Sequence, residues 1–456
     1  MNLFDSVVRE ISEFVVGDVV VGNDVSAEVK RRVLDSLGCF FGAWDEDALV
    51  AARKAVSKHV SNVKGASVWG SGVKTSPDWA TFVNGVGVRA LDFNDTYLSK
   101  EPLHPSDMIP AIIAAGEVYG SSGKEIIEAI AVGYEVGCRL CDAATLRKRG
   151  WDHVNFTMIG AVAGVCRVMK LGFEQTANSI SLAVVPHAAM RQTRAGELSM
   201  WKGAAAANAC RNAVFACLLA ESGMTGPSQP FEGEMGFFKQ VAGTSFSLAG
   251  LAATKNPRKI LETYVKYNPV EYHAMTAVDA ALKALRRAGS VDNIAKVRVD
   301  TFEASYTILA KDAEKWRPTT RETADHSLPY IVAVTLLDDG VWLDSFDRKR
   351  IASSDVAEFM KRIEIVEDPV LTQRYPEELV NRVTLMLKNG ETVSVEEAIP
   401  RGHYKNPMSD EEIEAKFHRL ASKRIDEGRR KEIVQKVRSL DKLNQVAELV
   451  EVVAGP

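Results

Sequence analysis

Residues 153–171 read HVNFTMIGAVAGVCRVMKL, a run of apolar and small side chains in which Arg167 and Lys170 carry the only permanent charges. A helix this apolar must be buried on most of its sides. Residues 105–119, 122–146 and 202–220 have the same character, so we expect residues 27–260 to form a set of packed helices. Small residues such as Gly160 and Gly164 would let neighbouring helices approach closely.

The pattern changes after about residue 255. Val297, Val299 and Thr301 alternate with polar residues, which predicts a strand. A second alternating run, residues 383–387, leads into Asn389-Gly390, a pair that supplies the two positive φ angles of a tight hairpin turn. Helical patterns over 270–287 and 327–337 lie between the strands, so this part is predicted to be α+β with antiparallel strands.

Helix returns over residues 409–456, where Ser409 to Glu412 form a capping box ahead of an apolar helical pattern. A final helix is expected from the apolar spacing over 433–449. We expect this tail to pack against the first helical region. The protein is therefore predicted to be mainly α, with a large helical domain from residues 1–262 and 404–456 and a smaller α+β domain inserted at 263–403. A cleft between two such domains is a common place for a small-molecule site.

Composition excludes several classes of function. The chain has 456 residues, of which 46% are hydrophobic and 25% charged, and its formal net charge is −4. This usage is typical of a globular protein, and no basic field is present to hold nucleic acid or an anionic membrane. The first residues lack the pattern of a signal peptide, and no run approaches the ~18 apolar residues of a membrane span. Six cysteines, mostly in apolar runs, suit reduced thiols, so a cytoplasmic protein is expected.

The densest polar cluster is LDFNDT at 91–96, followed by HPSD at 104–107. Asp92 and Asp95 are three residues apart, and His104 precedes a proline at the start of the next apolar segment. Taken singly, these residues suit helix caps and solvated loops. Together, two carboxylates, a hydroxyl and an imidazole suit acid–base chemistry or a divalent metal, and the sequence leaves both open.

Two further clusters lie at the starts of apolar helices. His153 follows Asp152 in a first helical turn, where the helix dipole lowers the pKa of an imidazole and favours its proton-accepting form, although a capping role is equally consistent. Lys202 opens another helix shortly after Arg194. A lysine there loses dipole stabilisation and needs a carboxylate partner or an anionic ligand, unless it extends along the surface to solvent.

The last clusters are HSLPY at 326–330 and the Cys138–Cys141 pair. Tyr330 begins a helix and could aim its hydroxyl into a cleft, or it could be a core tyrosine bonded to backbone. The C-x-x-C pair has no partner pair at zinc-site spacing, and an iron–sulfur cluster would need a third thiolate such as Cys166. We expect no metal and no cofactor.

In their order and spacing, these segments resemble the MmgE/PrpD family, which contains 2-methylcitrate dehydratase and cis-aconitate decarboxylase. The resemblance extends through ELSMWKG at 197–203, GMTGP at 223–227 and GHYKNPMSD at 402–410. It implies a helical domain with a smaller lid, homodimers, a site at the domain boundary and no iron–sulfur cluster. LDFNDT with HPSD is similar to the dehydratase branch. By motif position, the family's active-site residues match Asp92, Thr96, His104, His153, Lys202, Lys266 and Tyr330.

The resemblance implies a tricarboxylate substrate that loses water. Lys202 and Lys266, helped by Arg194, would neutralise its carboxylates so that carbanion-like charge can develop. His104 and His153 would transfer protons, and Asp92 would orient a histidine. Tyr330 would bring a proton from the lid as it closes. Thr96 and His326 complete the expected substrate-binding set.

Three alternatives stay open. Cis-aconitate decarboxylase, or another tricarboxylate lyase or epimerase of the same family, would use much the same residues. A metal-dependent lyase would use Asp92, Asp95 and His104 as ligands. A non-catalytic helical assembly protein would bind no tricarboxylate.

Overall fold

The computed structural model describes residues 4–59, 65–196 and 198–455. Contacts between residues divide them into two compact units. Unit 1 comprises the described residues of Met1–Arg194, Met200–Val265 and Ser409–Pro456, and unit 2 those of Ala195–Ser199 and Lys266–Met408. Helices dominate the chain, and strands are few.

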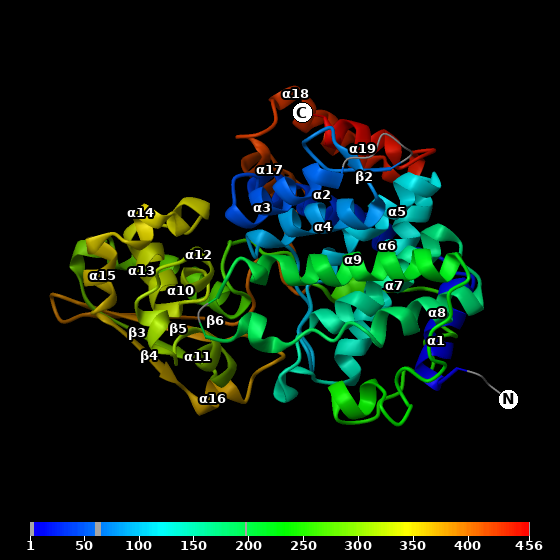
Figure 1. Ribbon diagram of the computed structural model, residues 1–456. Helices are drawn as coiled ribbons and strands as arrows, with labels where there is room; N and C mark the ends of the chain where they lie inside the picture. The colour runs from blue at the N-terminus through cyan, green and yellow to red at the C-terminus, as the bar shows by residue number, and fades with distance from the viewer. Residues whose placement is uncertain (1–3, 60–64, 197, 456) are drawn as a thin grey trace. The chain divides into compact units, whose positions relative to one another are not determined.

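Apolar helices form the centre of unit 1 (Figure 1). They are α4 (Pro77–Ala90), α5 (Ile109–Tyr119), α6 (Gly123–Ala143), α7 (Val154–Met169) and α9 (Trp201–Glu221). The pairs α4–α9, α6–α7 and α7–α9 make the most extensive contacts, and α7 is buried along nearly its whole length. The predicted close approach is confirmed at Gly160, where an added Cβ would lie 2.9 Å from the Gly133 carbonyl oxygen of α6.

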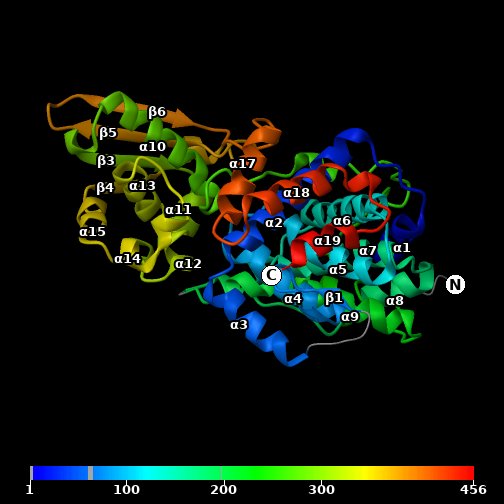
Figure 2. The same ribbon diagram turned by 90° about the horizontal axis from the view of Figure 1, so that it is seen from above.

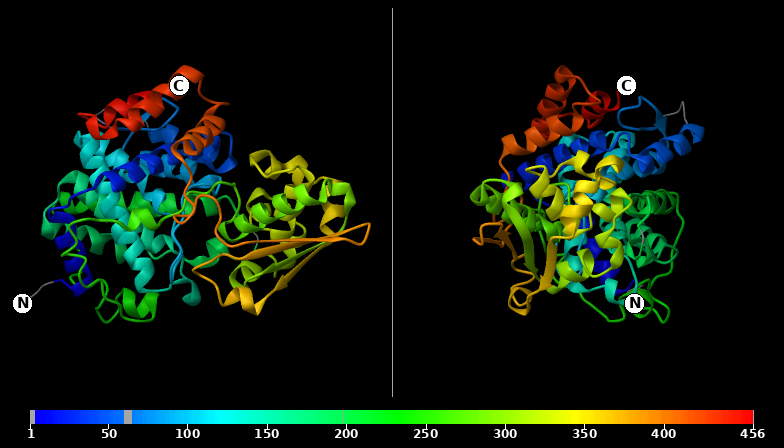
Figure 3. Two further views of the ribbon diagram at one scale, coloured as in Figure 1. Left: turned by 180° about the vertical axis from the view of Figure 1, so that it is seen from behind. Right: turned by 90° about the vertical axis from the view of Figure 1, so that its left-hand side faces the viewer.

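Outer elements of unit 1 come from both ends of the chain. Near its start lie α1 (Ser6–Val16), α2 (Asn23–Gly42), α3 (Asp47–Val56) and a short antiparallel pair, β1 (Ala66–Ser67) with β2 (Lys74–Thr75), and α8 (Phe173–Val184) follows α7. Near its end lie α17 (Asp410–Ala421), α18 (Glu427–Arg438) and α19 (Ala447–Ala454). Figures 2 and 3 show these last helices beside the N-terminal helices, and α17 packs directly on α2.

The predicted capping box is confirmed, because Ser409 and Glu412 cap each other's backbone at the start of α17. The single helix expected over 433–449 is wrong. A 3-10 turn, Leu440–Lys442, and an extended segment separate α18 from α19. In this interruption the Leu443 carbonyl accepts from Gly123 N–H, and Val446 N–H donates to the Ser121 carbonyl. Backbone pairing with the start of α6 therefore replaces the helical bonds.

Unit 2 contains a sheet of four strands in the order β4 (Ile363–Glu367), β3 (Ile294–Thr301), β5 (Asn381–Leu387) and β6 (Thr392–Glu397) (Figure 2). Helix α10 (Met275–Ala288) packs on β5 and β6, and α13 (Leu328–Leu337) packs on α10. Side chains of β5 alternate between buried and half-buried, as the sequence predicted. Short helices complete the unit: α11 (Glu303–Leu309), α12 (Arg321–Ala324), α14 (Arg348–Ile351), α15 (Ser354–Met360) and α16 (Pro369–Thr372).

Two details of this sheet correct the prediction. β3 and β4 are parallel, since the helical segments between them supply the long crossover that a parallel pair requires. The β5–β6 hairpin is present, but of its turn residues only Gly390 has a positive φ, +88°. Leu387 accepts from Gly390 N–H and donates to the Glu391 carbonyl. The loop is therefore a wider turn with one left-handed glycine, rather than a two-residue turn.

One helix in the described ranges, α9, is long and apolar enough to cross a membrane by length and composition. In its most apolar window, 72% of the residues are buried inside the protein. That degree of burial is what a core helix of the bundle requires.

Candidate active site

The loop after α4 begins with a left-handed residue. Asp92 has φ +50° and follows Leu91, the residue that caps the C-terminal end of α4. Aspartate tolerates this conformation better than most residues, but it still costs roughly 1–3 kcal/mol, and such strain is concentrated at functional sites. The buried Asp92 carboxylate ion-pairs with Arg89 and lies 3.4 Å from the Lys202 ammonium in the first turn of α9. Lys202 thus has the carboxylate partner that its position at a helix start requires.

His104 immediately precedes a 3-10 turn, Pro105–Met108, and both of its ring nitrogens are engaged. Nε2 lies 2.9 Å from Arg89 Nη2, while Nδ1 lies 2.7 Å from the Asp95 carbonyl oxygen and 2.9 Å from Thr96 Oγ1. A guanidinium can only donate, so Nε2 must be the acceptor. The proton therefore sits on Nδ1, which donates to the Asp95 carbonyl, and the imidazole is neutral.

His153 lies buried just before α7, in a similar setting. Its Nδ1 is 3.2 Å from Asp152 Oδ1, and its Nε2 is 3.5 Å from Arg194 Nη2. Arg194 also bonds Asp152 Oδ1 through Nε at 3.1 Å. Burial, and then the positive charge of Arg194, lower the pKa of His153 to about 3. The imidazole is neutral, as one of the two sequence interpretations expected, but it lies just before α7, and burial and Arg194 are the causes of its lowered pKa.

The two imidazoles are neighbours. Their ring centroids are 5.6 Å apart and their planes are inclined by 63°. Unit 1 therefore brings together six of the predicted site residues, carried by the α4–α5 loop, the start of α7, the start of α9 and the segment between α8 and α9. They are Asp92, Thr96, His104, His153, Arg194 and Lys202.

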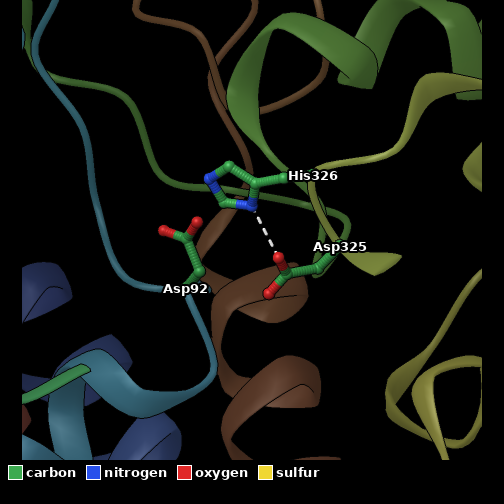
Figure 4. Close-up of side chains that lie close together, drawn as sticks. All are labelled: Asp92, Asp325 and His326. Atoms are coloured by element: carbon green, nitrogen blue, oxygen red, sulfur yellow. Dashed lines mark hydrogen bonds and ion pairs between the residues drawn. The ribbon is translucent and has the colours of Figure 1, made fainter. Parts of the chain in front are cut away.

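The other predicted residues, Lys266, His326 and Tyr330, belong to unit 2. His326 Nδ1 is hydrogen-bonded to Asp325 at 2.5 Å, drawn as a dashed line in Figure 4. Tyr330 is buried, and its hydroxyl donates to the Ser345 carbonyl, which is the structural alternative that the sequence left open. Burial also raises the pKa of Tyr330. Its predicted proton transfer would require the bond to Ser345 to break.

The sequence reasoning missed two charged groups. Arg89 contacts both Asp92 and His104, and its only signal was a charge three residues before Asp92 at the end of an apolar helix. In unit 2, Glu271 bonds His273 Nδ1 at 2.7 Å. Although burial opposes ionisation, His273, His326 and Lys266 lower the pKa of Glu271 to about 2. Neither His273 nor Glu271 lay in a motif that the sequence singled out.

The structure disfavours the metal site of Asp92, Asp95 and His104 through the bonding of Asp95. The Asp95 carboxylate accepts from Ser106 N–H at 2.8 Å and from the Tyr134 hydroxyl at 2.7 Å, and Arg32 lies 3.5 Å away. These partners belong to a structural network, and they use the oxygens that a metal would need.

The cysteines are no better suited to hold an iron–sulfur cluster than Asp95 is to bind a metal. Burial raises the pKa of both Cys138 and Cys141 well above its ordinary value, which opposes the thiolate form that ligation requires. Cys166 Sγ lies 3.5 Å from Cys217 Sγ, so the third candidate thiol contacts another cysteine of unit 1.

Comparison with known proteins gives two domain matches in succession. The MmgE/PrpD N-terminal domain matches residues 9–249, and the MmgE/PrpD C-terminal domain matches residues 268–442. The chain is 29% identical to 2-methylcitrate dehydratase of Cupriavidus necator over 425 residues, which cover 88% of this chain and 86% of the relative. It is 29% identical to the Escherichia coli (strain K12) protein of that name over 431 residues, 87% of this chain and 86% of the relative. Human cis-aconitate decarboxylase is 26% identical over 445 residues, 94% of this chain and 90% of the relative.

Proposed function

Since the chain belongs to the MmgE/PrpD family, we propose that this lyase dehydrates 2-methylcitrate to 2-methylaconitate without a metal. The observation that carries the proposal is the pair of neutral imidazoles, 5.6 Å apart, flanked by the cations of Lys202, Arg194 and Arg89. Neutral imidazoles can accept a proton, and the cations suit a substrate with several carboxylates.

Dehydration removes a proton from carbon and a hydroxyl from the neighbouring carbon. The carbon acid lies beside a carboxylate and is weak until that carboxylate is neutralised, which we assign to Lys202 and Arg194. One neutral imidazole takes the proton and becomes an imidazolium, which hands that proton to the departing hydroxide, so that water leaves and the imidazole is neutral again. We assign these transfers to His104 and His153. Thr96, Lys266 and His326 are proposed substrate contacts, and proton donation by Tyr330 stays a prediction.

Product analysis by NMR tests the substrate. The protein is incubated in turn with 2-methylcitrate, citrate and cis-aconitate, and we expect water loss from 2-methylcitrate to give the unsaturated tricarboxylate. Release of CO₂ from cis-aconitate, with 2-methylcitrate unchanged, would instead establish a decarboxylase. Absence of tricarboxylate binding in calorimetry would favour the non-catalytic assembly protein.

Substitution of the imidazoles tests the assignment of residues. Replacing His104 or His153 with alanine should each lower kcat by ~10²–10⁴, the usual contribution of a proton-transfer group. His59, an exposed histidine that stacks on Trp79, provides the matched control, and His59→Ala should leave the rate unchanged. Near-full activity in both His104→Ala and His153→Ala would contradict the assignment.

Two further expectations accompany the proposal. A metal-dependent lyase would lose activity after exhaustive chelation and regain it with a divalent ion, whereas we expect chelation to have no effect. We also propose a cytoplasmic homodimer, and light scattering should give twice the mass of the chain.

A further inference from the structure

Arg89 occupies a central position among the site residues of unit 1. It lies in the last turn of α4, and only 2% of its surface is exposed. One guanidinium nitrogen, Nη1, bonds Asp92 Oδ1, and the other, Nη2, lies 2.9 Å from His104 Nε2. The same planar group therefore joins a carboxylate to an imidazole, while the shortest distance between those two, from Oδ1 to Nε2, is 4.0 Å.

The second imidazole repeats the arrangement. Arg194 holds Asp152 Oδ1 through Nε at 3.1 Å and places Nη2 3.5 Å from His153 Nε2. In both cases the guanidinium lies at Nε2, a carboxylate ion-pairs with the same arginine, and Nδ1 faces an oxygen. Each imidazole is thus held neutral, with its basic lone pair directed at a guanidinium.

We infer that Arg89 is a positioning residue: the Asp95 carbonyl holds the proton on His104 Nδ1, and Arg89 keeps the Nε2 lone pair in a hydrogen bond until a carboxylate of the ligand takes the guanidinium N–H. The inference deepens the proposed function and rests on it. A carboxylate competes well for this group, because charge-assisted hydrogen bonds to guanidinium are roughly twice as strong as neutral ones. Once the hydrogen bond from Arg89 is released, Nε2 can receive the proton that leaves the substrate carbon. The electron pair of that C–H bond then moves to expel the hydroxide.

A spectroscopic experiment tests the hydrogen bond from Arg89 to His104 Nε2 without turnover. The protein is labelled with ¹⁵N-histidine, and the signals of its eight histidines are assigned with a His104→Gln variant. Wild type should show His104 with a protonated Nδ1 and a hydrogen-bonded, unprotonated Nε2. Tricarballylate, a tricarboxylate that has no hydroxyl to lose, should shift the Nε2 signal toward that of a free lone pair.

The matched variant is Arg89→Gln. Its His104 should keep the Nδ1 proton that the Asp95 carbonyl accepts, but its Nε2 signal should already lie near that of a free lone pair, and tricarballylate should no longer move it. A protonated Nε2 in wild type, or identical spectra in wild type and Arg89→Gln, would overturn the inference. These outcomes are independent of product analysis. An Nε2 signal that depends on Arg89, in a protein that dehydrates no tricarboxylate, would contradict the proposed function and leave the positioning role established.

Kinetics provide the second readout. Arg89→Lys keeps the charge, but a lysine ammonium donates from one nitrogen. It therefore cannot bridge Asp92 and His104 as the two terminal nitrogens of the guanidinium do. We expect kcat to fall ~10²-fold in both Arg89→Lys and Arg89→Gln, the low end of a lost proton-transfer group. Arg139→Gln is the control, because Arg139 also pairs with a carboxylate of unit 1, that of Glu135 at 2.7 Å. Wild-type kcat in Arg89→Lys would show that the bridging guanidinium is not needed and would overturn the inference.

Discussion

At the scale of single residues, the site is built from charges that are buried together with their partners. Asp92 has Arg89 and Lys202, and Asp152 has Arg194. Although burial opposes ionisation of Asp152, the charge of Arg194 lowers its pKa. Pairing keeps these carboxylates ionised where an isolated charge would be too costly to bury. His153 stays neutral in the same surroundings because it is buried and the guanidinium of Arg194 lies against it.

His153 gives a prediction for stability against pH. Its pKa is about 3 in the folded protein and 6.5 in the reference state, so between these values the unfolded chain binds a proton that the native protein does not. Stability should therefore fall as the pH drops from about 6.5 toward 3, and a His153→Gln variant should lose that part of the dependence. Thermal unfolding of both proteins from pH 7 to pH 4.5 measures the difference.

Asp107 contributes in the opposite direction. Burial raises its pKa to about 7, so the native protein holds a proton that the unfolded chain releases, and stability falls as the pH rises through this range. The comparison of His153→Gln with wild type isolates the imidazole, because Asp107 is present in both. If the gap in Tm between the two proteins were constant across the pH range, the depressed pKa of His153 would be contradicted.

At the scale of elements, α17 supports the loop that carries Asp92. The buried Lys416 ammonium of α17 lies 2.6 Å from Asp35 of α2 and donates to the Phe93 carbonyl at 2.8 Å. It also lies 3.7 Å from the centroid of the Phe93 ring. One side chain near the C-terminal end therefore fixes the residue that follows Asp92.

Removal of this ammonium should be strongly destabilising. Lys416→Met should lower the free energy of unfolding by about 3–5 kcal/mol, the usual effect of breaking a buried ion pair from one side. Urea denaturation checks the value. The double variant Asp35→Leu with Lys416→Met should recover much of the loss, since it leaves no buried charge behind. A Lys416→Met protein as stable as wild type would show that the pair is not buried as described.

The contact between α6 and α7 gives a second prediction at this scale. An alanine at Gly160 would place its Cβ 2.6 Å from Met108 Sδ and 2.9 Å from the Gly133 carbonyl oxygen. We expect Gly160→Ala to cost about 1–3 kcal/mol by overpacking. Gly428 in α18 is the control, because it is exposed and its added Cβ would meet only the Asp426 side chain, at 3.2 Å. Gly428→Ala should be neutral or stabilising, and urea denaturation of both variants compares them.

At the scale of the whole molecule, unit 1 is assembled from segments at both ends of the chain. Glycines let α2 approach α17 closely: an added Cβ would lie 3.2 Å from the Phe417 Cα at Gly38 and 2.8 Å from the Leu420 side chain at Gly42. The C-terminal helices are therefore part of the core of unit 1.

Truncation after Met408 tests this dependence. Loss of α17, α18 and α19 would expose the apolar face of α2 and remove the partner of Asp35, so we expect an insoluble product or one without cooperative thermal unfolding. A protein that ends at Ala454 is the control and should unfold as wild type does. Circular dichroism on heating compares them, and a truncated protein with an unchanged transition would contradict the description of unit 1.

The sequence by itself determined the features that depend on near neighbours. Apolar spacing located the helices, the Ser409 capping box located the start of α17, and the β5–β6 hairpin followed from alternation and a glycine. Lys202 was recognised from its place at a helix start as a cation that needs a partner. These signals are local because helix caps, turns and side-chain periodicity involve residues a few positions apart.

Only the tertiary structure decided which distant groups meet. It supplied Asp92 as the partner of Lys202, Arg89 as the donor to His104, and the start of α6 as the backbone partner that interrupts the final helical pattern. It also made β3 and β4 parallel. The pairing of buried donors, acceptors and charges is set by packing between segments far apart in the chain, and no local pattern specifies which segment arrives beside which.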